Sequence, residues 1–169
     1  EGVRGSVDDL PDFYHTELCS RSRARSNQIG YSSEWKELSG LPCAERFRIR
    51  EGAAFNPHAR VRAVQRTVPM GDRNATDFSQ IAHQGVLRVG GVCRAEENLT
   101  YRGPVPRGRT TEATMIDDHI VTQVCPTAVL GKKPRPHDRD VVLLSAVDRA
   151  YADAGLCPKL AKQKRYEPV

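Results

Sequence analysis

The stretch ATMIDDHIVTQV, residues 113–124, places two adjacent aspartates between two apolar runs. The first run ends at Ile116 and the second begins at His119. The pattern predicts a strand, a tight turn and a second strand, with Asp117 and Asp118 at the turn. Adjacent carboxylates repel each other, and a divalent cation would relieve that repulsion and favour ionisation of both. A solvated turn without a ligand is the plainer interpretation, and the rest of the chain must decide between the two.

Further segments lie in order around this predicted hairpin. DLPDFYH at residues 9–15 carries two acids and an aromatic pair, VPMGDRNA at residues 68–75 contains a Pro-x-Gly step, and AGL at residues 154–156 precedes several lysines. In this order the segments resemble the palm of reverse transcriptases, the RNA-templated DNA polymerases of retroviruses and retrotransposons. The resemblance covers most of the chain and implies an RNA-directed DNA polymerase, a nucleotidyltransferase of the retrotransposon type.

The resemblance implies a set of catalytic acids. Asp9, Asp117 and Asp118 match the carboxylates that hold the catalytic metal ions, with Asp8 as the fallback for Asp9 because the two are adjacent. Nucleotide addition is phosphoryl transfer, in which two cations stabilise the attacking and the leaving oxygens. Magnesium prefers oxygen ligands, so carboxylates from separate strands suffice. We therefore expect two Mg²⁺ ions, with Mn²⁺ as a substitute, and convergence of Asp9 with the hairpin acids in one cleft.

The resemblance also implies a nucleotide-binding set. Asp12 would lie near the triphosphate and offer its backbone N–H, although a surface turn explains this acid equally well. Tyr14 would lie under the incoming sugar and exclude a 2′-hydroxyl, with a core tyrosine as the alternative. Met70 stands where many retroviral members carry glutamine, and it would pack on the sugar and base because a thioether donates no hydrogen bond. Gly71 would let the backbone approach the nucleotide closely.

The C-terminal segment supplies the remaining catalytic candidate. Lys162 is the best match for the lysine that protonates the leaving pyrophosphate, and Lys164 is the second choice. Both lysines would otherwise be charges of a basic tail, which we expect over residues 158–169. Met115 departs from the family pattern, because an aromatic residue is common at its position.

Periodicity predicts the elements that would carry these residues. A strand ends at Asp9, and two strands flank a loop at residues 52–58. A helix follows Asp72, its N-cap, and ends at Gly90; its apolar face comprises Ala75, Phe78, Ala82 and Val86. A second helix runs from about Asp138 to Ala154 with Gly155 as C-cap; its face comprises Val141, Leu144, Val147, Tyr151 and Ala154.

These elements predict an α+β fold, a polymerase palm-like antiparallel sheet with two helices packed on one face and many loops. Trp35 is the expected packing anchor of the segment that follows the first acids. We interpret residues 1–169 as one palm-like domain that is a fragment of a longer polymerase, with the fingers and thumb segments missing. The isolated chain should then bind primed template without extending it.

Charge indicates the class of partner. The net charge is +5, and arginines are concentrated between residues 46 and 73, which favours a polyanion. The resemblance specifies an RNA or DNA template–primer as the partner and deoxynucleoside triphosphates as substrates. No apolar run approaches the ~20 residues of a membrane span, so we expect no membrane partner. The cysteines form no C-x-x-C pair and suggest reduced thiols, which favours an intracellular location, cytoplasmic or nuclear.

Two alternatives remain open at the level of sequence. A degenerate, non-catalytic remnant would keep only nucleic-acid binding through its arginines. A metal-dependent nuclease would use the same acids and would need a histidine or lysine beside the metal, for which His119 is the candidate. Magnesium binding separates both enzymes from the remnant, and incorporation of a labelled deoxynucleotide separates the polymerase from the nuclease.

Overall fold

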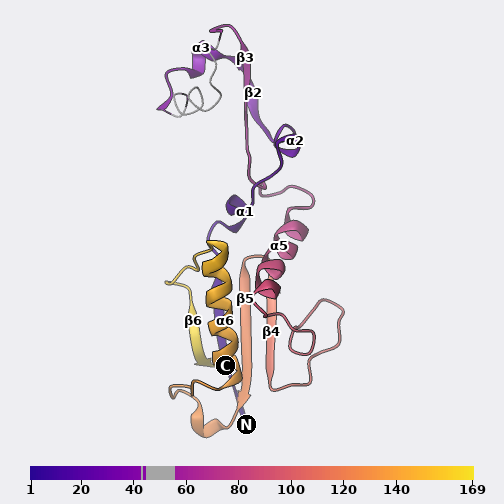
Figure 1. The fold of residues 1–169 in the computed structure, drawn as a ribbon, viewed down its shortest axis with the longest axis vertical. Coiled ribbons are helices and arrows are strands. Elements are labelled where there is room, and N and C mark those ends of the chain that lie inside the picture. The colour runs from indigo at the N-terminus through magenta and orange to yellow at the C-terminus, as the bar shows by residue number, and fades with distance from the viewer. Residues whose placement is uncertain (43, 45–55) are drawn as a thin grey trace. The chain divides into compact units, whose positions relative to one another are not determined.

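The computed structural model describes residues 1–42, 44 and 56–169 (Figure 1). Helices and antiparallel strands both occur, so the predicted α+β class is confirmed. The strand predicted around Phe47 and Ile49 lies outside the described residues. No helix in the described part of the chain is long and apolar enough to cross a membrane.

The chain divides into two compact units. Unit 1 comprises Glu1–Tyr14 and Gly71–Val169, and unit 2 comprises His15–Met70. Both ends of the chain therefore build unit 1, and unit 2 is inserted between them. The single palm-like domain expected over the whole chain stays a prediction.

A four-stranded antiparallel sheet forms the frame of unit 1, in the order β4-β5-β1-β6. Its strands are β1 (Gly2–Asp9), β4 (Thr110–Met115), β5 (Asp118–Cys125) and β6 (Lys164–Pro168). Strands β4 and β5 form the predicted hairpin around the two adjacent aspartates. The register of β1 on β5 runs from Gly2 opposite Cys125 to Asp9 opposite Asp118.

Strand β6 corrects the expectation of a basic tail at residues 158–169. Its backbone pairs with the outer edge of β1, with Lys164 opposite Val7 and Pro168 opposite Arg4. An edge strand tolerates charged residues and proline because one side of its backbone needs no partner. A basic sequence with little apolar character can therefore still be a strand.

Helices α5 (Ala75–Val89) and α6 (Arg139–Ala154) lie side by side on one face of this sheet (Figure 1). Helix α6 matches its prediction in bounds and caps: Asp138 is the N-cap, and Gly155 ends the helix with φ 70°, the left-handed conformation that glycine adopts easily. Its predicted apolar face is wrong at Ala154, which is exposed. The core between helices and sheet includes Leu10, Phe13, Leu87, Val121, Leu143, Leu144, Val147 and Tyr151.

The predicted apolar face of α5 is wrong in part. Phe78 is 56% exposed and Ala82 is exposed, whereas the buried positions are Ala75, Ser79, His83 and Leu87. The helix is rotated from the orientation that hydrophobic periodicity predicts, because His83 finds buried hydrogen-bond partners. The predicted cap is displaced as well: Asn74 is the N-cap by position, and Asp72 accepts a hydrogen bond from the Asn74 N–H.

Unit 2 is smaller and built on a two-stranded sheet. Strands β2 (Gln28–Glu34) and β3 (Arg60–Val64) pair antiparallel, and β3 confirms the second strand predicted between residues 43 and 68. Short helices α2 (Arg21–Ala24) and α3 (Trp35–Leu38) flank β2. Trp35 is buried, as expected of a packing anchor.

A buried ion pair fastens β1 to the start of α6. The Arg4 guanidinium donates to both carboxylate oxygens of Asp140, each at 2.6 Å, and to Asp138 Oδ2 at 2.9 Å. Arg4 and Asp140 are each 3% exposed. The same guanidinium holds the pKa of Asp138 below its usual value. The bidentate geometry satisfies charges that the core would otherwise leave unpaired.

Replacing Arg4 alone tests this fastening. Arg4→Met should lower the free energy of unfolding by about 3–5 kcal/mol, because Asp140 keeps its charge in the core without a partner. The double variant Arg4→Met with Asp140→Leu should recover most of the loss. Urea unfolding of the three proteins measures both effects, and a double variant no more stable than Arg4→Met would contradict the assignment.

Candidate functional site

The antiparallel register brings the predicted acids together. Asp9 and Asp118 are directly opposite residues at the ends of β1 and β5, so their Cβ atoms are about 5 Å apart on one face of the sheet. Asp117 lies in the turn before β5, and its carbonyl accepts a hydrogen bond from the Leu10 N–H at 3.0 Å. Three carboxylates from two distant parts of the sequence therefore share one end of the sheet.

The alternation of strand side chains separates Asp8 from Asp9. Asp8 is fully buried on the helix-covered face, where Gln163 donates to it at 2.7 Å and Arg165 pairs with it at 2.7 Å. Asp9 projects from the opposite, open face and is partly exposed. The fallback assignment of Asp8 is therefore wrong, since its carboxylate points away from Asp118.

The open face concentrates negative charge. Burial raises the pKa of Asp118, and the neighbouring charges of Asp117 and Asp9 raise it further. The Lys162 ammonium partly offsets this charge by bonding to Asp9 Oδ2 at 2.5 Å. That bond raises the pKa of Lys162, with added help from Asp118 and Asp117. A cation already belongs to this acidic cluster.

The two candidate lysines have different surroundings. Lys162 lies at the acids, as predicted, and the Lys159 N–H donates to the Asp9 carbonyl at 2.9 Å, which holds this segment against the end of β1. Lys164 belongs to β6 and pairs with Glu167 at 3.6 Å. The second-choice assignment therefore has no support from position.

The donor chemistry of the acidic cluster suits a hard divalent cation. Asp9, Asp117 and Asp118 offer carboxylate oxygens, the ligands that Mg²⁺ prefers. Among the described residues, however, no three His, Cys, Asp or Glu side chains are already arranged to hold a metal ion. Lys162 engages Asp9 instead, so metal binding requires a change in that contact.

Helix α5 holds the acidic turn through two side chains. The Gln80 amide oxygen accepts from the Ile116 N–H at 2.7 Å, and its NH₂ donates to the Thr114 carbonyl at 2.8 Å. His83 Nδ1 donates to the Ile116 carbonyl at 2.7 Å. Ile116 has φ 55°, a left-handed conformation that strains a β-branched residue. Such strain persists only where the surroundings impose it, and these hydrogen bonds impose it here.

The second nitrogen of His83 anchors the turn to α6. Because Nδ1 carries the proton donated to Ile116, Nε2 accepts from the Tyr151 hydroxyl, at 2.7 Å. Both side chains are buried, and burial lowers the pKa of His83 to about 4. The neutral imidazole therefore connects α6, α5 and the turn that precedes Asp117.

Acid should weaken this connection. The pKa of His83 is about 4 in the fold against an ordinary 6.5, so between these values the unfolded chain binds a proton that the folded chain does not. The free energy of unfolding should therefore fall as the pH decreases from about 6.5 to about 4, by about 3 kcal/mol from this group. Urea unfolding of parent and His83→Gln over this range isolates it. If the free energy of unfolding changed with pH equally in the two proteins, His83 would not be the group responsible.

Gln80 should control the order of the turn. Gln80→Leu removes both side-chain hydrogen bonds and leaves the Ile116 N–H without its partner, which costs about 1–3 kcal/mol for the two bonds. Hydrogen exchange at the Ile116 amide should accelerate, while exchange in β1 changes less. Gln84→Leu on the same helix is the matched control, because Gln84 bonds to Arg88 and not to the turn. If exchange at the Ile116 amide accelerated equally in both variants, the Gln80 hydrogen bonds would not be what orders the turn.

The predicted nucleotide-binding residues lie, along the chain, close to the two points at which it passes from one unit to the other. Asp12 is exposed with φ 52°, and Tyr14 is half-buried in α1 (Phe13–Thr16). Met70 is 74% exposed and is the last residue of unit 2, whereas Gly71, with φ 89°, is the first residue after the return to unit 1. Their nucleotide-binding roles stay predictions.

Sequence reasoning missed most of the residues that support the acids. Gln80 and His83 occupy the inward side of α5. Arg165 on the edge strand, and Gln163 just before it, hold Asp8. The available signal for Gln80 and His83 was their spacing of three residues, which places two polar side chains on one side of α5. His119, the residue on which the nuclease alternative rests, is fully buried on the helix-covered face and bonds to Glu112 at 3.2 Å.

Comparison with known proteins adds no further assignment. The sequence matches no protein-family model, and no curated protein matches it.

Proposed function

We propose that this chain is the palm region of a retrotransposon-type reverse transcriptase, which extends a DNA primer on an RNA or DNA template. One observation carries the proposal: Asp9 lies directly opposite Asp118 on neighbouring antiparallel strands, with Asp117 in the turn between β4 and β5. A strained turn held by buried side chains supports it, because strain of this kind is concentrated at functional sites.

The acids would act by binding divalent metal. Asp9 and Asp117 would hold two Mg²⁺ ions, or Mn²⁺ in their place, with help from Asp118. When bound, such ions stabilise both the attacking primer hydroxyl and the leaving pyrophosphate. Burial raises the pKa of Asp118, and repulsion by Asp117 and Asp9 raises it further; a nearby cation would offset the repulsive part.

Lys162 would have two successive roles in this scheme. In the resting protein its ammonium neutralises Asp9. Metal binding at Asp9 would release the ammonium, which lies 57% exposed at the rim of the cluster and could then donate a proton to the leaving pyrophosphate. The same side chain would thereby prevent repulsion among the acids before the substrate arrives.

Nucleotide and template contacts follow from the same proposal. Asp12, Tyr14 and Gly71, all in unit 1, would face the incoming deoxynucleoside triphosphate. Arg60 and Arg62 are exposed on β3 and would contact template phosphates. The affinity should fall as the salt concentration rises, because the release of counterions from the phosphates then contributes less free energy.

One observation favours a second candidate, a non-catalytic nucleic-acid-binding remnant. The Lys162–Asp9 ion pair satisfies Asp9 without any metal, as a protein that had lost catalysis could retain. Such a remnant would bind primed template equally well with and without magnesium. The polymerase proposal instead requires magnesium for any nucleotide incorporation.

An acid-to-amide substitution tests the proposal. In a polypeptide that carries this chain with its own flanking coding sequence, Asp117→Asn should abolish incorporation of labelled deoxynucleotide on a primed RNA template. Template binding should change little, because phosphate contacts supply most of the affinity.

The matched control is Asp153→Asn, which makes the same chemical change at an exposed position of α6. The control should incorporate nucleotide at the parental rate. Incorporation by Asp117→Asn at that rate would reject the polymerase assignment. An inactive parent that binds template independently of magnesium would support the remnant.

A further inference from the structure

The outward side of α5 is apolar in a way that its fold does not explain. Phe78 is 56% exposed, Ile81 is 66% exposed and Val89 is 93% exposed. Their spacing, with Gly85 between them, places them along one side of the helix, opposite the buried positions. Contiguous exposed apolar surface of this kind marks an interaction site in many proteins.

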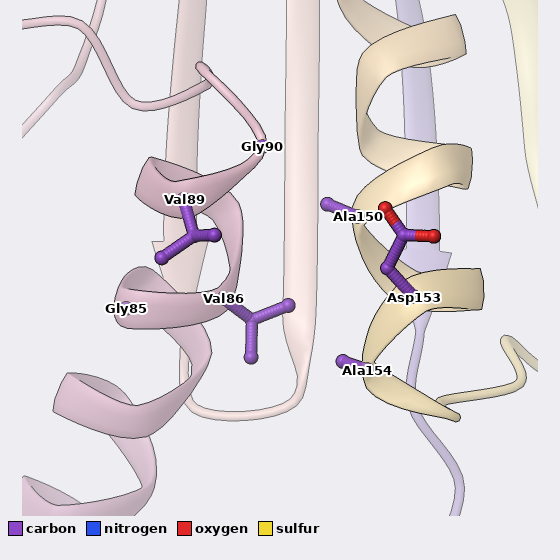
Figure 2. Close-up of a pocket in the computed structure, with 7 residues that line it drawn as sticks. All are labelled: Gly85, Val86, Val89, Gly90, Ala150, Asp153 and Ala154. Carbon is purple, nitrogen blue, oxygen red and sulfur yellow. The ribbon is translucent and has the colours of Figure 1, made fainter.

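A groove runs beside this stripe, between α5 and α6 (Figure 2). Its volume is about 390 Å³. The helices approach closely at Gly90, where a Cβ would lie only 2.5 Å from the Ala150 Cβ. The absence of a side chain at Gly90 permits this approach. Small side chains leave the groove open; it is lined by Gly85, Val86, Val89, Gly90, Ala150, Asp153 and Ala154. Helix α5 therefore carries large exposed side chains and also forms one wall of a groove that could receive such a side chain.

We propose that a second copy of this chain docks here, with the two α5 helices antiparallel about a two-fold axis. In such a pair with the two-fold axis at the level of residue 83, positions equally far from that level face each other. Ile81 of one copy then lies opposite Gly85 of the other, and Phe78 lies within one residue of the level of Val89. A bulky side chain meets a gap and an aromatic ring meets a valine, so the surface is complementary to itself.

Charge complementarity selects this occupant and this orientation. Asp77 and Arg88 are both exposed, near opposite ends of α5 and on the same flank of the apolar stripe. The antiparallel arrangement places Asp77 of each copy opposite Arg88 of the other. In a parallel two-fold pair opposite flanks of the helices meet, so Asp77 and Arg88 would not face each other. The proposal does not depend on the polymerase function.

The dimer should be weak. A helix of 15 residues is about 22 Å long, so the contact is smaller than a standard protein interface. We expect a dissociation constant of roughly 1–100 µM, which sedimentation velocity over micromolar to near-millimolar concentrations of the whole chain can measure.

Gly85 offers a variant that separates docking from folding. A Cβ at Gly85 would meet no other atom within 4 Å, so Gly85→Leu fits the isolated copy and fills the place that Ile81 of the second copy occupies. The dissociation constant should rise by about tenfold or more while the melting temperature of the dilute protein is kept or increased. Val142→Leu, a change at an exposed position of α6, is the control and should leave association unchanged.

Charge exchange gives the decisive test. Asp77→Arg and Arg88→Asp should each weaken self-association, because each creates two like-charged contacts. An equimolar mixture of these two variants should associate again as a heterodimer, since every contact is then between opposite charges. Failure of the mixture to associate overturns the proposal. A parent that stays monomeric over the whole concentration range, or cross-links from α5 to any segment other than α5 or α6, also overturns it.

Discussion

The register of β1 on β5 is the constraint on which the rest of the site depends. Side chains alternate along a strand, so the pairing that opposes Asp9 to Asp118 also directs Asp8 into the core. A shift of one residue would bury Asp9 and expose Asp8, and would break the bidentate pair between Arg4 and Asp140. The buried ion pairs of Asp8 with Arg165 and of Arg4 with Asp140 therefore favour the same register from opposite ends of one strand.

This interior is unusually polar for its size, which explains how a chain with only 38% hydrophobic residues builds a core. Arg4, Glu112, His119 and Asp140 are all buried beneath the helices. Such pairs contribute little net stability compared with apolar residues of similar volume, but they penalise any arrangement that separates the partners. We infer that they specify the register and the seating of the helices more than they stabilise the fold.

The sequence alone predicted the elements that local patterns control. The hairpin at Asp117, helix α6 and its Gly155 cap, and the end of β1 at Asp9 all follow from apolar runs, capping residues and breakers. The orientation of α5 did not follow, because the partners of His83 lie on β4–β5 and α6, far along the chain. Strand β6 was missed because backbone pairing at a sheet edge imposes no apolar pattern. The contacts of Gln163 and Arg165 to Asp8 were missed for the same reason.

The central claim is that Asp9, Asp117 and Asp118 form one cation-binding cluster, and paramagnetic NMR tests it most directly. Substoichiometric Mn²⁺ should broaden the amide signals at the ends of β1 and β5 and in the turn between β4 and β5. Asp118→Asn should reduce this broadening, and excess Mg²⁺ should reverse it in the parent. Absence of broadening at these amides, or equal broadening at acidic positions elsewhere on the surface, would contradict the account.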